Sequence, residues 1–139
     1  MKTTKVALGV VAAVLIAVLA GYFWGAAGRR TAEREVEGVT LRIDLLEARG
    51  ALLAARVDLY NVNFGNASRH LQEALDLLRP TSTRLKELSR AADAQRLDLA
   101  LARIEEAQRL AGKLDQGANA RAGDAAGAID EILQSSAKR

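Results

Sequence analysis

The stretch VEGVTLRIDLLEARGALLAARVDLYNV, residues 36–62, decides the fold. Its apolar residues recur at alternating steps of three and four, which is the period of one face of an α-helix, and they do so on two faces. The first stripe consists of Val36, Val39, Ile43, Leu46, Gly50, Leu53, Val57 and Tyr60, and continues to Phe64. The second stripe consists of Leu41, Leu45, Ala48, Leu52, Ala55, Leu59 and Val62.

Two apolar stripes on one helix predict that it is covered from two sides. A two-stranded coiled coil needs only one heptad stripe, so we expect residues 31–62 to form a long helix inside a bundle or a stack of helical hairpins. Gly50 costs about 1 kcal/mol of helix propensity relative to alanine, which predicts that another backbone passes close to it.

Helical periodicity continues to the C-terminal end, so the predicted fold class is all-α, built from antiparallel helical hairpins. Asparagine and glycine in residues 61–66 predict a tight turn. We expect a second helix over 67–79 that Pro80 ends, with Thr81, Ser82 and Thr83 as candidate caps of the next helix. Residues 83–113 then form one helix, or two with Asp93 as a cap, and a last helix spans 118–133. The inner face of this last helix is Ala118, Ala122, Ala125, Ile129 and Ile132.

Residues 6–28 form an apolar run without any charged side chain, flanked by lysines before it and arginines after it. As a helix the run would be about 34 Å long, enough to cross a hydrocarbon core of roughly 30 Å. We therefore predict a single-pass anchor over 6–28, a basic tail over 1–5, a helical-hairpin domain over 29–134 and a polar tail over 135–139.

Two alternatives concern this anchor. Val18-Leu19-Ala20 offers a site that a signal peptidase could cleave, whereas the length of the run favours a retained anchor in an inner membrane. Lys2 and Lys5 favour an extracytoplasmic (periplasmic) domain, whereas Arg29, Arg30, Arg34 and Arg42 on the other flank favour a cytoplasmic one. We expect the extracytoplasmic orientation.

Composition excludes several classes of function. The net charge of the whole chain is +3, and Lys2 and Lys5 supply much of it, so the domain after the anchor is nearly neutral. Its charges of both signs are interleaved, whereas nucleic-acid binding needs a one-sided basic patch, so we expect no nucleic-acid partner. The chain contains no cysteine, which excludes disulfides, thiol nucleophiles and thiolate metal sites.

Residues 54–80 carry a helix-turn-helix pattern with small–large–small spacing in its second half, at Ala67, Leu71 and Ala74, and a closing Pro80. This segment resembles one unit of the tetratricopeptide family. The same spacing returns 33 residues later at Ala100, Ile104 and Ala107, close to the period of that family. Ala51 and Asp58 depart from the large aromatic residues that the family places in the first helix. The resemblance implies stacked helical hairpins and protein binding.

No residues form a catalytic pattern. His70 is the only histidine, and because we expect no carboxylate or cysteine ligands near it, we expect a surface or capping residue. The pairs Glu105-Glu106 and Asp130-Glu131 are adjacent in sequence and diverge around their helices. We expect no enzymatic activity, cofactor or metal.

Arg42, Arg49 and Arg56 recur every seven residues between the two stripes. They are either a cationic strip for an acidic partner or long side chains whose stems cover apolar surface while their charges stay hydrated. Together with Tyr60, Phe64 and His70 they are the candidate protein contacts, although Tyr60 and Phe64 also fit plain core packing.

The sequence therefore predicts a non-enzymatic, membrane-anchored interaction or scaffold protein. Its partners would be membrane lipid, through the anchor, and another protein or a second copy of itself. The alternative function is a membrane-tethered sensory domain that binds a small ligand between its helices.

Overall fold

A computed structural model describes Val18 and residues 35–137 of the chain. It divides into two compact units, residues 1–39 and residues 40–139, which are considered separately. Of the first unit, Val18 and residues 35–39 are described, and all of them are helical. Helical residues run without interruption from residue 35, the first described residue of this stretch, to residue 60, and this segment is called the 35–60 helix.

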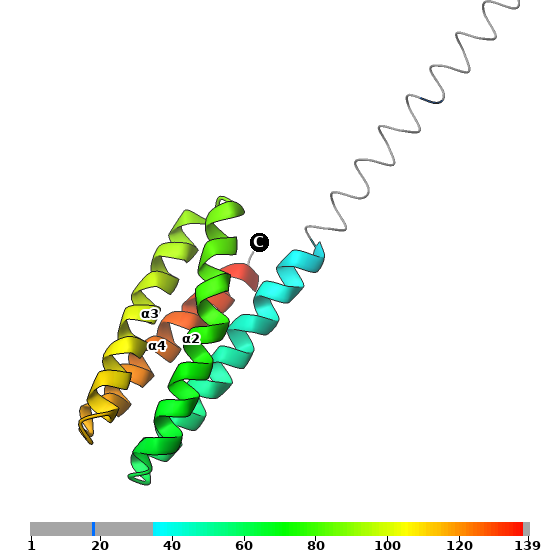
Figure 1. The fold of residues 1–139 in the computed structure, drawn as a ribbon. Coiled ribbons are helices and arrows are strands. Elements are labelled where there is room, and N and C mark those ends of the chain that lie inside the picture. Colours follow the sequence, from blue (N-terminus) through cyan, green and yellow to red (C-terminus); the bar gives the residue numbers. More distant parts are fainter. Residues whose placement is uncertain (1–17, 19–34, 138–139) are drawn as a thin grey trace, which may run out of the picture. The chain divides into compact units, whose positions relative to one another are not determined.

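The second unit is an all-α bundle, as the sequence predicts (Figure 1). After the helix over residues 35–60 come α2 (Phe64–Glu87), α3 (Ala91–Ala111) and α4 (Gly117–Ala137). The turns between them are short, so each helix runs antiparallel to its neighbour in sequence, as in an up-and-down bundle.

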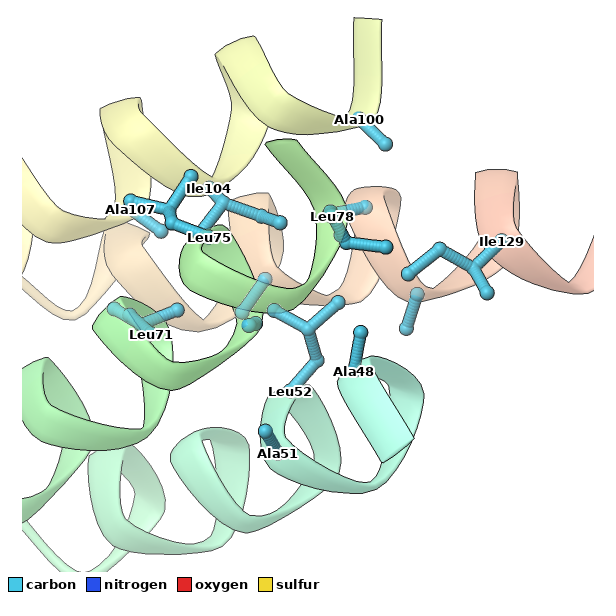
Figure 2. Packing of buried hydrophobic residues seen from close by; sticks show 14 of the residues in the cluster. Ala48, Ala51, Leu52, Leu71, Leu75, Leu78, Ala100, Ile104, Ala107 and Ile129 are labelled. Carbon is cyan, nitrogen blue, oxygen red and sulfur yellow. The ribbon is translucent and has the colours of Figure 1, made fainter. Parts of the chain in front are cut away.

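The core is built from the second stripe and the inner faces of the other helices. From Leu41 to Leu59 every residue of the second stripe is buried, whereas Val62, in the turn, is exposed. Figure 2 shows Leu52 facing Leu71, Leu75 and Leu78 of α2, with Ile104 and Ile129 closing the centre. Many of the remaining core positions are alanines, which let the helices approach closely. The predicted inner face of the last helix is confirmed at all five positions.

Polar contacts join neighbouring helices around the outside of the bundle. Taken around the bundle from the 35–60 helix through α2 and α3 to α4, the ion pairs are Asp44–Arg84, Arg79–Glu105, Glu106–Arg121 and Asp130–Arg49. The last pair returns from α4 to the 35–60 helix, so the ring of helices is closed. Each pair is at least partly exposed and is worth roughly 0–1 kcal/mol, so burial of the apolar faces supplies most of the stability.

The expected helix end at Pro80 is wrong, because α2 continues through this residue to Glu87. Pro80 lacks the N–H that would bond to the carbonyl of Asp76. The core overrides this penalty, since Leu78 before the proline and Leu85 after it are both fully buried. Pro80 itself is exposed.

Thr81 and Ser82 are not helix caps, because both are buried inside α2. The hydroxyl of Thr81 donates to the carbonyl oxygen of Leu77 at 2.8 Å, and that of Ser82 donates to Asp98 of α3. Thr83 lies on the exposed side of the same helix. Hydroxyl groups thus satisfy a backbone acceptor and a neighbouring carboxylate close to the proline.

Residues 83–113 belong to two helices, which was one of the two alternatives from the sequence. The break between the helices lies earlier than expected, at Leu88–Arg90. Asp93 lies within the first turn of α3 and is buried, so it is not the residue that precedes the helix. Ala92, next to Asp93, is exposed, and Ala94 is buried.

Residues with positive φ occur in each of the three turns, and none of them is glycine. They are Val62 (φ 60°), Ser89 (φ 57°) and Leu114 (φ 57°). Leu114 is exposed because it lies in the turn. Gly65, expected in the first turn, lies inside α2, whose start Asn63 caps by accepting from the backbone N–H of Asn66.

Helix α4 continues past its expected end at Leu133 to Ala137, because Ser135 and Ser136 find partners at the start of α3. Among the residues that the structure describes, no helix has both the length and the hydropathy of a membrane span. The predicted anchor over 6–28 lies, except for Val18, outside the described residues.

Candidate functional site

The first stripe is not covered within the second unit. Its part on the 35–60 helix from residue 43 onward, here called the exposed stripe, comprises Ile43, Leu46, Gly50, Leu53, Val57 and Tyr60. Every one of these residues is exposed, and Tyr60 keeps 81% of its surface accessible. The expectation that this helix is covered from two sides is therefore wrong within the described chain. Only the second stripe is covered.

The position of the exposed stripe follows from helix geometry. The second stripe faces the core, and the exposed stripe lies on the opposite side of the same helix. Outside it, the exposed large apolar residues of the second unit are scattered single positions, Val62, Leu99 and Leu114. Isolated apolar residues on a surface are ordinary, but a contiguous row of them marks an interaction site.

Polar side chains on both flanks tie the 35–60 helix to its neighbours. On one flank the carboxylate of Asp44 accepts from Arg84 of α2 at 2.9 Å. On the other flank Arg49 pairs with Asp130, and the Nε of Arg56 donates to Asn119 at 3.0 Å, both partners lying on α4. These contacts fix the rotation of the helix, which keeps the exposed stripe turned outward.

The arginine row has two different roles. Arg49 and Arg56 use their charged groups to contact α4, as just described. They are therefore neither a cationic strip for an acidic partner nor side chains whose charges simply stay hydrated. Arg42 is exposed and, within the described residues, forms no ion pair. Only Arg42 of the three is therefore free to contact another molecule with its charge.

The structure separates the aromatic candidates. Tyr60 ends the exposed stripe, whereas Phe64, at 9% accessible, belongs to the core at the start of α2. Phe64 is therefore a core residue, as the core-packing alternative predicts. Whether Tyr60 binds a partner stays a prediction.

His70 lies at the junction of the 35–60 helix and α2. Its Nε2 is 3.6 Å from Asp58 and its Nδ1 is 3.2 Å from Glu73, so it does have carboxylates beside it, contrary to the expectation from sequence. Asp58 is on the preceding helix, twelve positions away and across a turn, which is why the sequence pattern did not reveal the pair. The contact connects the two helices near the end of the exposed stripe.

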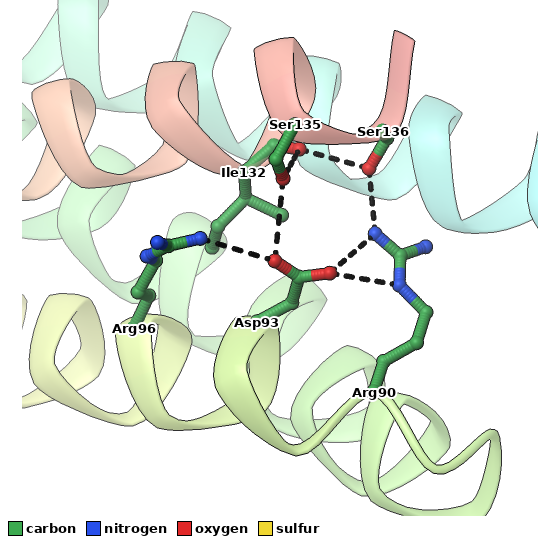
Figure 3. Close-up of polar contacts among 6 residues, drawn as sticks. All are labelled: Arg90, Asp93, Arg96, Ile132, Ser135 and Ser136. Atoms are coloured by element: carbon green, nitrogen blue, oxygen red, sulfur yellow. Dashed lines mark hydrogen bonds and ion pairs between the residues drawn. The ribbon is translucent and has the colours of Figure 1, made fainter. Parts of the chain in front are cut away.

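A polar cluster that the sequence did not reveal joins the start of α3 to the end of α4. The carboxylate of Asp93, fully buried, accepts from Arg90, Arg96 and Ser135 (Figure 3). Arg90 also donates to Ser136 at 2.6 Å. Asp93 is thus paired and hydrogen-bonded, as a buried charge must be, and its negative charge near the start of α3 suits the helix dipole. The role of this cluster is to hold two helix ends together.

One carboxylate at the junction of α2 and α3 has an altered acidity. The hydroxyl of Ser82 donates to Asp98, and the ammonium of Lys86 lies 2.9 Å from it. Both contacts lower the pKa of Asp98 below its ordinary value of 3.8, and the hydrogen bond from the Ser82 hydroxyl has the largest effect. Because Asp98 is half-exposed at the junction of α2 and α3, its effect is on the stability of that junction.

Among the open hollows on the surface of the second unit are two that border described helices. One, of about 610 Å³, is bordered by Glu47 and by residues of α2, mostly charged or polar: Arg69, Gln72, Glu73, Asp76 and Leu77. The other, of about 350 Å³, adjoins the C-terminal end of the exposed stripe and is bordered by Leu53, Arg56, Val57, Tyr60, Asn61 and Asn119. The smaller one extends the apolar surface of the stripe towards α4.

No group of His, Asp and Glu side chains in the described part of the chain is arranged to hold a metal ion. Comparison of the chain with family models, with characterised proteins and with solved structures finds no significant match. The exposed stripe is therefore the feature of the described chain that points most directly to a function.

Proposed function

We propose that this protein is a non-enzymatic interaction protein, anchored to a membrane by residues 6–28, whose helical bundle presents a protein-binding surface. The observation that carries the proposal is the exposed stripe, an uninterrupted row of apolar side chains and one glycine on an otherwise well-packed bundle. Large apolar side chains left in water carry a cost that burial against a partner would remove, at roughly 25 cal/mol per Å².

The shape of the exposed stripe suits a protein rather than a small molecule. Residues 43–60 of a helix extend for about 27 Å, and the stripe follows this whole length as a convex ridge. Small molecules bind in concave sites that enclose most of their surface, whereas a ridge of this period is matched by the apolar face of another helix. The occupant that fits best is therefore helical.

The anchor places this surface close to a bilayer. Fourteen residues separate Gly28, at the end of the predicted anchor, from Ile43, at the beginning of the exposed stripe. A partner held in or near the same membrane would meet the stripe at a high local concentration. We propose an inner membrane and an extracytoplasmic domain, following the lysines before the anchor.

Photo-crosslinking in cells that produce the full chain tests the proposal. A photoreactive phenylalanine analogue replaces Leu53 in the exposed stripe, and in a control it replaces Leu99, which is also an exposed leucine but lies on α3. We expect discrete protein adducts at Leu53 and none at Leu99. If neither position gives an adduct, or both give the same ones, the stripe is not a specific protein-binding surface.

A further inference from the structure

We infer that the exposed stripe binds a second copy of this chain, and that the two 35–60 helices form a parallel, in-register coiled coil. The inference rests on the proposed function, because it names the partner of the same surface. Three observations carry it: the residue types along the stripe, the charges beside it and the glycine at its centre.

The residue types match those of a two-stranded parallel coiled coil. Labelling Ile43 as heptad position a places Gly50 and Val57 at a as well. Position d is then occupied by Leu46, Leu53 and Tyr60. Branched Ile and Val at a, combined with Leu at d, favour two parallel strands over higher oligomers. In sequence the same period extends to Val36 and Val39, which gives more than three heptads.

The same labelling explains how one helix can serve both the bundle and a dimer. The second stripe occupies positions c and f, so the core lies on one side of the helix and positions a and d on the other. Asp44, at b, faces α2, and Arg49, at g, faces α4. A second copy can therefore dock on positions a and d without displacing α2 or α4.

Charge complementarity selects the parallel orientation. In a parallel pair, a g side chain meets the e side chain five residues later in the other helix, which places Arg42 beside Glu47 of the second copy. Within the described residues neither Arg42 nor Glu47 forms an ion pair, so both charges are available. An antiparallel pair would instead bring position g of one helix next to position g of the other. Because position g holds arginines, like charges would then meet.

Gly50 lies halfway along the exposed stripe, where nothing among the residues that the structure describes requires a glycine. A Cβ at this position would meet no atom within 4 Å, so the expectation that another backbone passes it is wrong for the described part of the chain. In the proposed dimer Gly50 faces its own copy across the symmetry axis and permits close approach of the two helices. A parallel dimer also places both predicted anchors at the same end, as two anchors in one bilayer require.

Disulfide trapping of the full chain in its membrane tests the register. Because the natural chain has no cysteine, single substitutions Leu46→Cys and Tyr60→Cys report only on their own positions. These two d positions are two heptads apart, so both can pair with themselves only in a parallel, in-register dimer. We expect mild oxidation to yield dimers for both, and none for the exposed control Leu99→Cys on α3. Trapping at one position only, at neither, or equally at Leu99 overturns the inference.

A charge exchange tests the orientation without new disulfides. Arg42→Glu and Glu47→Arg each bring like charges together at two symmetric places, which we expect to weaken dimerisation of the full chain about tenfold. The double variant restores opposite charges and should return the dimer to within about twofold of the natural one. A double variant as weak as the single ones would show that these residues do not meet.

Failure of the dimer and failure of the proposed function can be told apart. An adduct at Leu53 whose mass differs from two chains, without any trapped disulfide, means that the partner is another protein and that the dimer is wrong. If no adduct forms at Leu53, both the dimer and the proposed function are wrong. Adducts of twice the chain mass together with trapped disulfides support both.

Discussion

Leu45 and Leu46 are adjacent in the 35–60 helix, yet they face opposite sides of it: Leu45 is 2% accessible and Leu46 is 46% accessible. The first belongs to the core of the bundle and the second to the exposed stripe. This division of one helix between a buried face and a face that the described residues leave open is the basis of the functional account.

The two leucines should respond differently to the same substitution. Leu45→Ala leaves a cavity between the helices and should lower the free energy of unfolding by about 3 kcal/mol. Leu46→Ala removes no contact from the core, so the monomer should lose less than about 1 kcal/mol while self-association weakens. Chemical unfolding of the full chain at low protein concentration measures both. Equal losses would mean that Leu46 is also part of a core.

The Asp93 cluster should be a strong determinant of stability. Asp93→Ala leaves Arg90, which is largely buried, without its carboxylate, and should cost about 3 kcal/mol. The matched control is Asp124→Ala, which breaks the exposed pair with Arg121 and should cost less than about 0.5 kcal/mol. Thermal unfolding of both variants measures the difference. Similar small effects would show that the cluster does not hold α3 and α4 together.

Val62 should be replaceable with a gain in stability. It has φ of 60°, a left-handed conformation that is costly for a β-branched residue, and its side chain is exposed. Val62→Gly should therefore raise the free energy of unfolding by up to about 1 kcal/mol. Ala102→Gly, at an exposed position inside α3, should lower it by about 1 kcal/mol. Loss of stability in both variants would contradict the left-handed turn.

Asp98 should make the bundle sensitive to acid. Its pKa in the folded chain is below the ordinary value of 3.8, so the unfolded chain takes up the proton first as the pH falls. The stabilisation is therefore complete well above 3.8 and disappears as the pH falls through the folded pKa. The natural chain should exceed Asp98→Asn in stability near neutral pH, and the difference should shrink below 3.8. A difference that does not change with pH would contradict this assignment.

The predicted anchor can be tested on the intact chain. If residues 6–28 cross the bilayer as proposed, the protein should remain with membranes after an alkaline wash and be released by detergent. The mass of the isolated protein then distinguishes the alternatives, since cleavage after Ala20 would remove the first 20 residues. Release by the alkaline wash, or the shortened mass, would show that the chain is not held by this segment.

Periodicity in the sequence was sufficient for the helices and most of the core. The second stripe from Leu41 to Leu59 and the inner face of α4 are buried as predicted, because an apolar residue at each helical turn has to be covered. The same periodicity identified the first stripe, but it cannot distinguish a stripe that the chain covers from one left for a partner. That difference depends on how many helices the chain provides.

The errors of prediction arose where long-range contacts outweigh local preference. Pro80 was expected to end a helix, but burial of Leu78 and Leu85 keeps α2 continuous. Asp93 was expected to cap a helix, but its partners Ser135 and Arg96 hold it inside the bundle. Of the candidate contacts, Arg49 and Arg56 find partners on α4 some 60 to 80 positions away, which a local pattern cannot reveal.

The most direct test of the central claim is the mass of the full chain in solution. Sedimentation equilibrium in density-matched detergent should give twice the chain mass for the natural protein. The variant with both Leu46→Ser and Leu53→Ser should sediment as a monomer with unchanged helix content, because both residues lie outside the core. A natural chain that is monomeric at every concentration, or a variant that remains dimeric, would contradict pairing through the exposed stripe.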